Sequence, residues 1–357
     1  MKRRHFKELR PLCVVCRGSG LDVPLELTTV EEENDGDVLV GVLQCSREGC
    51  QREYPILDGI PLLVADLRTY VTNQVGPMLG RQDLSENLES LIGDCLGPGS
   101  SFEVTRQHLS TYTWSHYGDL DPGETSPPAS GGAAAAILER AVELAPAGSG
   151  AIVDLGCAVG RNSFNLAASS DSLVLGLDLS YAMLRVARRA LMEGRVRYPR
   201  RRVGGVYDRR DFPISLDGHE RVDFWAADAL ALPFADASLT AAACLNVLDC
   251  VSSPVAFLAE LERALKSNAP AWLASPYDWN AAATPQENWL GGHSQRGVED
   301  GGASEAALRR LLTPGEHPQA LQGFEIVGEE ETIPWSLRLH DRSRMTYDVH
   351  LTALRRR

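Results

Sequence analysis

Apolar residues from position 133 onward follow two alternating patterns. AAAAILERAVELA at 133–145 has the spacing of an amphipathic helix, and AIVDL at 151–155 is typical of a short buried strand. Further strands are predicted at 173–178, 222–228, 239–247 and 271–275, and helices from about 161, after the N-cap Ser180 as far as Gly194, and at 254–265. This alternation indicates an α/β fold with a doubly wound, Rossmann-like and mostly parallel sheet.

The C-terminal pattern is different. FEIVGEE at 324–330 and RMTYDVHLTALRR at 344–356 read as two strands joined by a short irregular segment, and the second alternates cleanly. We expect an antiparallel pair at the sheet edge. The prediction is therefore a seven-stranded sheet whose last strand is antiparallel.

Three segments divide the chain. Residues 1–65 carry two cysteine pairs and form a small module, and residues 66–132 are mostly amphipathic helix. The latter segment ends in a Pro-, Gly- and Ser-rich stretch at 118–132, which indicates a linker or lid. Residues 133–357 form the main domain.

Composition narrows the class of protein. The chain has 357 residues, 44% of them hydrophobic, and no apolar run of the roughly 18 residues that span a bilayer. No secretory signal follows the basic N-terminus, so we expect a cytoplasmic protein without membrane contact. The formal net charge of -13 argues against nucleic acid as a partner. The sequence does not indicate an oligomeric state.

Acidic residues end three of the predicted strands. Asp154 lies in DLGCAVG, where a strand leads through a glycine turn into a helix; the loop lacks the dinucleotide and P-loop fingerprints. Asp178 ends the next strand and can accept hydrogen bonds from ribose hydroxyls. Asp228, followed by Ala229, ends a third strand and can accept from an adenine amine. Together they predict an adenosine-containing cofactor with a cationic end.

This combination resembles the class I S-adenosylmethionine-dependent methyltransferases, over about residues 133–357. The resemblance implies S-adenosylmethionine as cofactor, held by Asp154, Gly156, Cys157, Ala158, Gly160, Asp178, Leu179, Asp228, Ala229 and Asn246. Ala158 stands where the family often has glycine. We interpret Cys157 as a small packing residue, because a reactive thiolate needs a neighbouring base or cation and only Arg161 is near in sequence.

The loop SPYDWNAAATPQENWLGG at 275–292 is rich in aromatic and hydrogen-bonding residues. With GCAVGRNSF at 156–164 and Leu248-Asp249, it resembles the methyltransferase domain that ends the ovothiol-biosynthesis enzyme and N-methylates 4-mercaptohistidine. The large oxidative domain of that enzyme is missing. The resemblance implies a small imidazole- or thiol-bearing acceptor, with Asn246, Asp249, Tyr277 and His116 as catalytic residues and Tyr112, Tyr117, Trp279, Asn288 and Trp289 as acceptor-binding residues.

Three of these residues have alternative roles. An imidazole becomes cationic when methylated, and aromatic faces stabilise cations. Trp279 and Trp289 can equally pack the loop onto the sheet. His116, in the predicted lid, has a structural alternative.

The N-terminal module has metal-ligand spacing. Cys13-x2-Cys16 and Cys45-x4-Cys50 offer four thiolates, which predict a structural zinc ion; an empty reduced site and a redox pair are the alternatives. YPILDGIPLLV at 54–64 resembles the end of the small zinc-binding activator protein of several methyltransferases. We expect Cys95, Cys244 and Cys250 to be buried small hydrophobes.

The segment between Gly194 and Arg221 is long and basic, which suits an RNA backbone or an acidic substrate, but we favour a solvated excursion whose arginines balance nearby acids. Three functions stay open. The first is N-methylation of a small histidine-derived acceptor. The second is RNA methylation, since zinc modules also precede the core of rRNA guanine methylases. The third is a non-catalytic adaptor, against which the intact strand-end acids argue.

Overall fold

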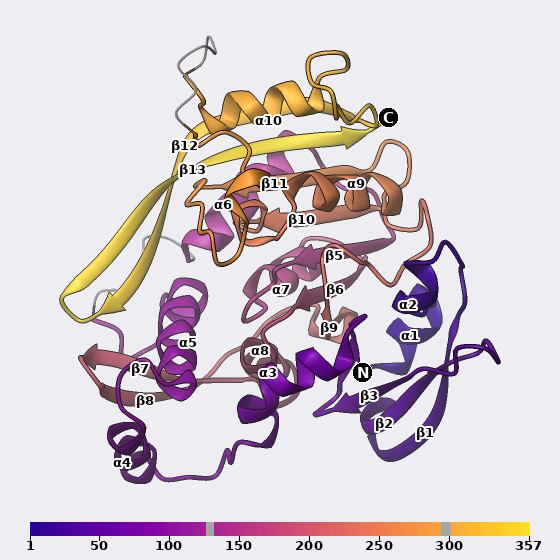
Figure 1. The fold of residues 1–357 in the computed structure, drawn as a ribbon. Helices are drawn as coiled ribbons and strands as arrows, with labels where there is room; N and C mark the ends of the chain where they lie inside the picture. Colours follow the sequence, from indigo (N-terminus) through magenta and orange to yellow (C-terminus); the bar gives the residue numbers. More distant parts are fainter. Residues whose placement is uncertain (126–131, 294–300) are drawn as a thin grey trace.

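The computed structural model describes residues 1–125, 132–293 and 301–357 (Figure 1). The predicted linker stretch at 118–132 therefore falls partly outside the described residues. The helices are α1 (Arg3–Leu9), α2 (Val14–Arg17), α3 (Leu67–Leu79), α4 (Glu86–Leu96), α5 (Ser101–Tyr117), α6 (Ala133–Leu144), α7 (Arg161–Ala168), α8 (Tyr181–Glu193), α9 (Pro254–Ala264) and α10 (Ser304–Leu312). In these parts of the chain, no helix combines the length and apolarity needed to cross a membrane.

The strands are β1 (Leu25–Asn34), β2 (Asp37–Cys45), β3 (Glu53–Leu57), β4 (Ile60–Leu63), β5 (Ala151–Leu155), β6 (Leu173–Asp178), β7 (Arg195–Val203), β8 (Val206–Pro213), β9 (Val222–Ala227), β10 (Ala241–Leu245), β11 (Pro270–Ser275), β12 (Phe324–His340) and β13 (Ser343–Arg356). The strands and helices predicted after residue 133 are all present in the predicted order, and α10, β7 and β8 are additional elements that the sequence did not predict. Helix α8 shows why the local pattern sufficed: Ser180 accepts a hydrogen bond from the Met183 N–H, and Gly194 ends the helix with φ 60°.

One sheet connects most of the strands. Its order is β1-β2-β3-β4-β9-β6-β5-β10-β11-β13-β12, with parallel pairing from β4 through β11 and antiparallel pairing of β13 with both of its neighbours. In the part of the sheet that runs in the order β9-β6-β5-β10-β11-β13-β12, β13 is antiparallel to the other strands, as expected. The predicted total of seven strands is too small, because the N-terminal module adds four more and makes the sheet eleven-stranded.

The N-terminal module joins the sheet through β4. Leu62 and Leu63 of β4 pair in parallel with Ala226 and Ala227 of β9, and Figure 1 shows β1, β2 and β3 beside this edge. The last residues of β9 lead directly to Asp228. The module therefore supports the strand that presents one of the candidate cofactor residues.

The C-terminal strands are longer than predicted. The expected irregular segment between 330 and 344 is strand over most of its length, and β12 and β13 form a long hairpin that projects from the sheet (yellow in Figure 1). Trp335 of β12 lies directly opposite Tyr347 of β13. Cross-strand pairing of these aromatic residues stabilises a hairpin that the apolar pattern alone did not reveal.

The basic insertion is also more regular than predicted. It forms the two-stranded hairpin of β7 and β8. Its arginines pair with acids, as expected: Arg200 lies 3.1 Å from Asp341, Arg209 lies 2.7 Å from Glu89, and Arg210 pairs with Asp121. These pairings hold the hairpin against the rest of the fold.

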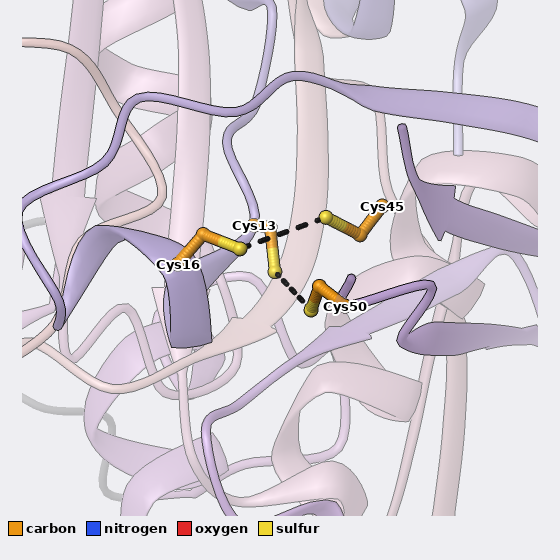
Figure 2. A group of neighbouring side chains, drawn as sticks. All are labelled: Cys13, Cys16, Cys45 and Cys50. Atoms are coloured by element: carbon orange, nitrogen blue, oxygen red, sulfur yellow. Dashed lines mark hydrogen bonds between the residues drawn. The ribbon is translucent and has the colours of Figure 1, made fainter. Parts of the chain in front are cut away.

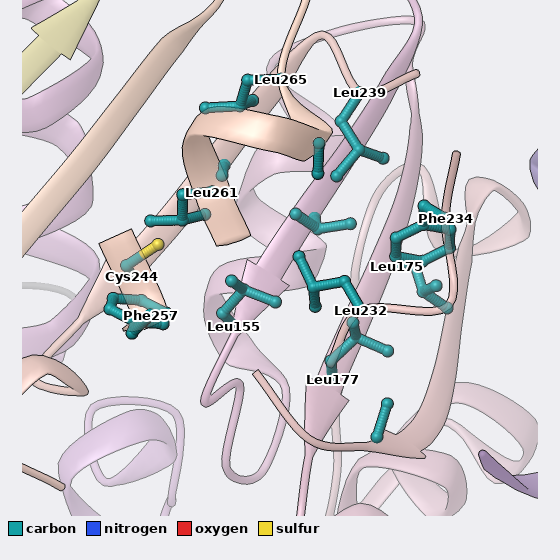
Figure 3. Packing of buried hydrophobic residues seen from close by; sticks show 14 of the residues in the cluster. Leu155, Leu175, Leu177, Leu232, Phe234, Leu239, Cys244, Phe257, Leu261 and Leu265 are labelled. Carbon is teal, nitrogen blue, oxygen red and sulfur yellow. The ribbon is translucent and has the colours of Figure 1, made fainter. Parts of the chain in front are cut away.

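Apolar residues form two clusters, one on each face of the sheet. Figure 3 shows part of the first cluster, where Leu155 lies near Phe257 and Leu261 of α9, and Leu175 and Leu177 lie near Leu232 and Phe234. Cys244 is fully buried there, as predicted. The same prediction was wrong for Cys95 and Cys250, which are exposed, because their sequence context does not show which face of each segment meets the core.

Candidate active site

The loop after β5 owes its shape to two glycines with positive φ. Gly156 has φ 67° and Gly160 has φ 86°, and a Cβ atom at Gly160 would lie 2.6 Å from the Phe224 ring. The N–H groups of Gly156 and Cys157 both donate to the Leu177 carbonyl, at 2.8 and 3.0 Å. Ala158 takes φ 49° without a glycine, so the departure from the family pattern does not prevent the turn.

The three strand-end acids lie on neighbouring strands. Because β9, β6 and β5 are adjacent and parallel, Asp228, Asp178 and Asp154 belong to the same edge of the sheet. Asp178 accepts from the Ala158 N–H at 2.9 Å and from the Ser180 N–H at 2.7 Å. Asp228 accepts from the Leu230 N–H at 2.9 Å.

Asp154 is the most enclosed of the three acids. Its side chain is buried and accepts a hydrogen bond from the Ser163 hydroxyl at 2.7 Å. Burial raises the pKa of Asp154 to about 7, with a smaller contribution from Asp178 and opposed by the Ser163 bond. A cationic group of a ligand would bring this carboxyl back to its charged form.

A cavity lies beside this loop, with about 430 Å³ of empty space that includes its opening to solvent. Its lining comes from α5, α6, β5 and the loop after it, α7, the end of β10 with the residue that follows, and β12. It consists of Tyr112, His116, Ala134, Asp154, Gly156, Cys157, Ala158, Asn162, Leu245, Asn246 and Trp335.

Three buried polar atoms of residues that line the cavity have no hydrogen-bond partner among residues 1–125, 132–293 and 301–357: Asn162 Oδ1, Asn246 Oδ1 and His116 Nδ1. Such atoms are costly unless a ligand or water satisfies them. Burial lowers the pKa of His116 to about 3, helped by Arg161, so the imidazole is neutral. The cavity is thus built to receive hydrogen-bonding groups.

Four further predicted residues lie on or beside the loops at this edge of the sheet. Tyr117 is fully buried, and its hydroxyl donates to the Val159 carbonyl at 2.9 Å. Cys157 lines the cavity, but burial raises the pKa of its thiol well above the usual value, which agrees with the packing interpretation. Leu179 is 44% exposed and Ala229 is half-buried, each directly after a strand-end acid.

The aromatic loop is placed differently from our expectation. Trp279 and Trp289 stack on each other, with their ring centroids 6.1 Å apart. The indole N–H of Trp279 donates to Ser304 Oγ, and that of Trp289 donates to the Thr284 carbonyl. Asn288 is exposed and donates to the Ser252 carbonyl. Among the described residues that line the cavity, none of these three is found. Their contacts correspond to packing of the loop.

Two predicted catalytic residues lie outside the cavity lining. The Tyr277 hydroxyl hydrogen-bonds His350 Nδ1 at 2.7 Å, which turns this side chain toward β13. Asp249 is buried and accepts from the Asp278 N–H at 2.8 Å, and burial raises the pKa of its carboxyl. Asn246, by contrast, reaches the cavity, as do Tyr112 and His116.

Sequence reasoning missed four lining residues: Ala134, Asn162, Leu245 and Trp335. Asn162 and Leu245 are close in sequence to predicted site residues, so the strand ends could have indicated them. Trp335 comes from the hairpin, and the alternation of Ile333, Trp335 and Leu337 was the available signal.

The four cysteines of the N-terminal module converge (Figure 2). Their sulfur atoms all lie within 4.8 Å of one another, with 3.9 Å between Cys13 and Cys50 and 3.7 Å between Cys16 and Cys45. Four sulfurs about 2.3 Å from a tetrahedral zinc ion would be about 3.8 Å apart. The donor set and spacing therefore fit zinc. The Tyr54 hydroxyl lies 3.2 Å from Cys13 Sγ.

Comparisons with solved structures give partial matches. A chain from work on conversion of a disulfide bond into a thioacetal group during echinomycin biosynthesis is 21% identical, with 62% of this chain and 80% of that chain covered and a TM-score of 0.40. A chain from a complex containing the Haloferax volcanii Trm112 methyltransferase activator is 19% identical, with 62% and 88% covered and a TM-score of 0.38.

A Haemonchus contortus phosphoethanolamine N-methyltransferase 2 chain is 19% identical, and this protein covers only 28% of it, with 39% of this chain aligned and a TM-score of 0.30. TM-scores this low carry no argument about function. No curated protein matches the sequence.

A family model gives the decisive match. The model described as "Methyltransferase domain" matches residues 153–273, which begin in β5 and end in β11 and include all three strand-end acids and Asn246. The site, the strand order and this match lead to one conclusion: the chain contains a class I methyltransferase domain and is an S-adenosylmethionine-dependent methyltransferase.

Proposed function

We propose that this methyltransferase N-methylates a small imidazole-bearing acceptor related to a thiol-histidine. The observation that carries the proposal is Asn246 Oδ1, a buried acceptor without a partner in the cavity wall. A neutral imidazole has one N–H donor and one ring nitrogen with a lone pair. An amide oxygen that accepts the N–H would leave the other nitrogen free to receive the methyl group.

The residues of the cavity, together with those at the neighbouring strand ends, fit S-adenosylmethionine. Asp154 would hold the ammonium group of its methionine end, where burial makes a counter-charge favourable. Asp178 and Asp228 would hold the ribose and adenine, with Leu179 and Ala229 beside them and the glycine turn of 156–160 against the cofactor. The cofactor supplies an electrophilic methyl group on a sulfonium.

The other cavity residues would orient and desolvate the acceptor. In-line displacement depends on alignment and exclusion of water more than on strong acids or bases. His116 is buried and neutral, and its unpartnered Nδ1 faces the same space, so it can accept or donate a hydrogen bond without repelling a developing cation. Tyr112 contributes an aromatic wall.

A methyl-transfer assay with labelled cofactor tests the acceptor. We expect transfer to 4-mercaptohistidine or a related thiol-imidazole and none to total RNA; labelling of RNA alone would overturn the proposal. Asn246→Ala should lower kcat/KM at least about 10-fold, because the ring loses its orienting partner. Asn288→Ala is the matched control, since that amide contacts the Ser252 carbonyl and should leave kcat/KM unchanged.

A small-molecule partner agrees with the charge distribution. Five arginines of β7 and β8, the hairpin that suggested RNA in the sequence, pair with acids such as Asp341, Glu89 and Asp121. Arginines committed to internal ion pairs release fewer counterions on nucleic-acid binding. This favours a small-metabolite acceptor over RNA.

We also propose that Cys13, Cys16, Cys45 and Cys50 bind one structural zinc ion. With four thiolate ligands, no position remains for water or substrate. Metal analysis of protein purified without chelator should give about one zinc per chain, and Cys95→Ser, outside the cluster, should keep it. A metal-free protein with a Cys16–Cys45 disulfide would contradict the assignment.

A further inference from the structure

Three aromatic side chains form a continuous wall at one side of the cavity. Tyr112 of α5 and Trp335 of β12 line the cavity, with ring centroids 6.4 Å apart. Tyr347 of β13 stacks on Trp335 at 5.4 Å and an interplanar angle of 23°. The indole N–H of Trp335 donates to Ser115 Oγ at 3.1 Å, which fixes the ring. The wall is therefore rigid and joins two distant parts of the chain.

Two carboxylates continue from this wall. The Tyr347 hydroxyl donates to Asp278 Oδ2 at 2.7 Å, and the Asp278 N–H donates to Asp249 Oδ2 at 2.8 Å. Asp278 is exposed and Asp249 is buried, three residues beyond Asn246. Stacking and hydrogen bonds thus connect the aromatic lining of the cavity to two carboxylates that lie beyond it.

The surrounding charge is negative. Among the described residues that line the cavity, Asp154 is the one acidic residue, and none is Lys or Arg. The pKa of Tyr112 is raised to about 12 by burial and, in smaller part, by Cys250, Asp178, Asp249 and Asp278. An aromatic wall close to acids, in a cavity whose described lining includes no Lys or Arg, is an environment that favours a cation.

We propose that Tyr112, Trp335, Tyr347, Asp249 and Asp278, here called the cation wall, bind a fixed ammonium group of the acceptor. The acceptor class is then a small molecule with a permanently charged amine beside its imidazole, such as an amino-acid derivative. This inference rests on the proposed function, because it assigns the wall to the acceptor and not to the cofactor.

The wall gives each part a separate task. Aromatic faces attract a cation without requiring one orientation, and Tyr347 holds Asp278 at the edge of the stacked rings. Asp278 supplies the charge that discriminates an amine from a neutral group of similar size. Removing the charge of Asp278 should therefore reduce the preference for a charged over a neutral ligand. It should have little effect on the stability of the fold, because the side chain is exposed.

Calorimetry on the full chain saturated with S-adenosylhomocysteine tests the wall. The probes are histamine, whose amine is charged at neutral pH, and 4-(2-hydroxyethyl)imidazole, its neutral counterpart. We expect the wild type to bind histamine at least about 10-fold more tightly. Asp278→Asn should remove most of that ratio, while Asp171→Asn, an exposed acid on another loop, should preserve it.

Other outcomes separate the two proposals. Equal affinity for both imidazoles would overturn the cation wall and leave the proposed function intact. Binding of tetramethylammonium but of neither imidazole, weakened by Asp278→Asn, would support the wall and overturn the imidazole acceptor. Loss of S-adenosylhomocysteine affinity in Asp278→Asn would assign the wall to the cofactor and overturn the inference, as would no binding of any probe.

Discussion

The Asp178 carboxylate accepts a hydrogen bond from the Ala158 N–H at 2.9 Å, so the acid that ends β6 fixes the loop that follows β5. Its other oxygen accepts from the Ser180 N–H at the start of α8. One side chain therefore connects two strands and a helix at the edge where the cofactor is expected. Its role in binding and its role in shaping the loop are not separable by position alone.

Replacing Asp178 with Asn should weaken S-adenosylmethionine binding at least about 10-fold, because an amide cannot accept from both N–H groups. Calorimetry measures the affinity, and thermal unfolding of the same samples reports any loss of loop structure. Asp171→Asn removes an exposed acid near the same strand and should change neither quantity. Full affinity in Asp178→Asn would exclude this carboxylate from the cofactor site.

Asp154 should make the stability of the cofactor-free protein depend on pH. Its pKa is raised from 3.8 to about 7, so the folded state holds a proton that the unfolded chain releases. The resulting stabilisation is complete below pH 3.8 and is lost as the pH rises through about 7, by at most about 4 kcal/mol. The Tm should therefore fall between about pH 5 and about pH 8.

The Asp154→Asn variant isolates this effect, since its amide oxygen can still accept from Ser163 but does not titrate. The Tm of this variant should decline less than that of the wild type over the same pH range, because position 154 no longer titrates. Some decline should remain, because Asp178 and Asp249, whose pKa values are also raised, are present in both proteins. Parallel curves for variant and wild type would contradict the prediction.

Loss of the proposed zinc ion should destabilise the N-terminal module. Cys45→Ser removes one of four ligands and should lower the Tm and the zinc content together, and a strong chelator should do the same to the wild type. Cys95 is exposed and outside the cluster, so Cys95→Ser is the control. A chelator that leaves the Tm unchanged would argue for an empty reduced site.

A buried ion network ties the module to the methyltransferase domain. Arg188 of α8 lies 2.9 Å from Asp223 of β9 and 2.8 Å from Asp37 of β2, and all three side chains are at most 6% exposed. Removing one partner of a buried pair leaves charge uncompensated. Arg188→Met should lower the free energy of unfolding by about 3–5 kcal/mol, measured by chemical denaturation.

The neighbouring Arg189 provides the comparison. It lies 3.4 Å from Glu193, whose side chain is 55% exposed, and Arg189→Met should cost less than about 1 kcal/mol. Equal effects of the two substitutions would mean that the network does not couple module and domain.

Local pattern was enough for the elements from 133 to 275, except the β7–β8 hairpin, and for the loop after β5. Helix period, the Ser180 cap and the end at Gly194 are encoded by residues close in sequence. The acids Asp154, Asp178 and Asp228 followed from the rule that parallel strands end at one edge. Asn246 was found for the same reason. In the N-terminal module, cysteine spacing indicated the four-sulfur cluster.

Other features depended on contacts between distant segments. The pairing of β4 with β9, which extends the sheet to eleven strands, joins residues more than 150 positions apart. Trp335 meets Tyr112 because the β12–β13 hairpin and α5 converge on the cavity, and Trp279 meets Trp289 because their loop folds onto itself. Sequence periodicity shows which residues share a face, but the partner of that face is decided by packing and strand pairing across the whole chain. The strand-end acids were therefore readable from the sequence, and the aromatic wall of the cavity was set by the tertiary structure.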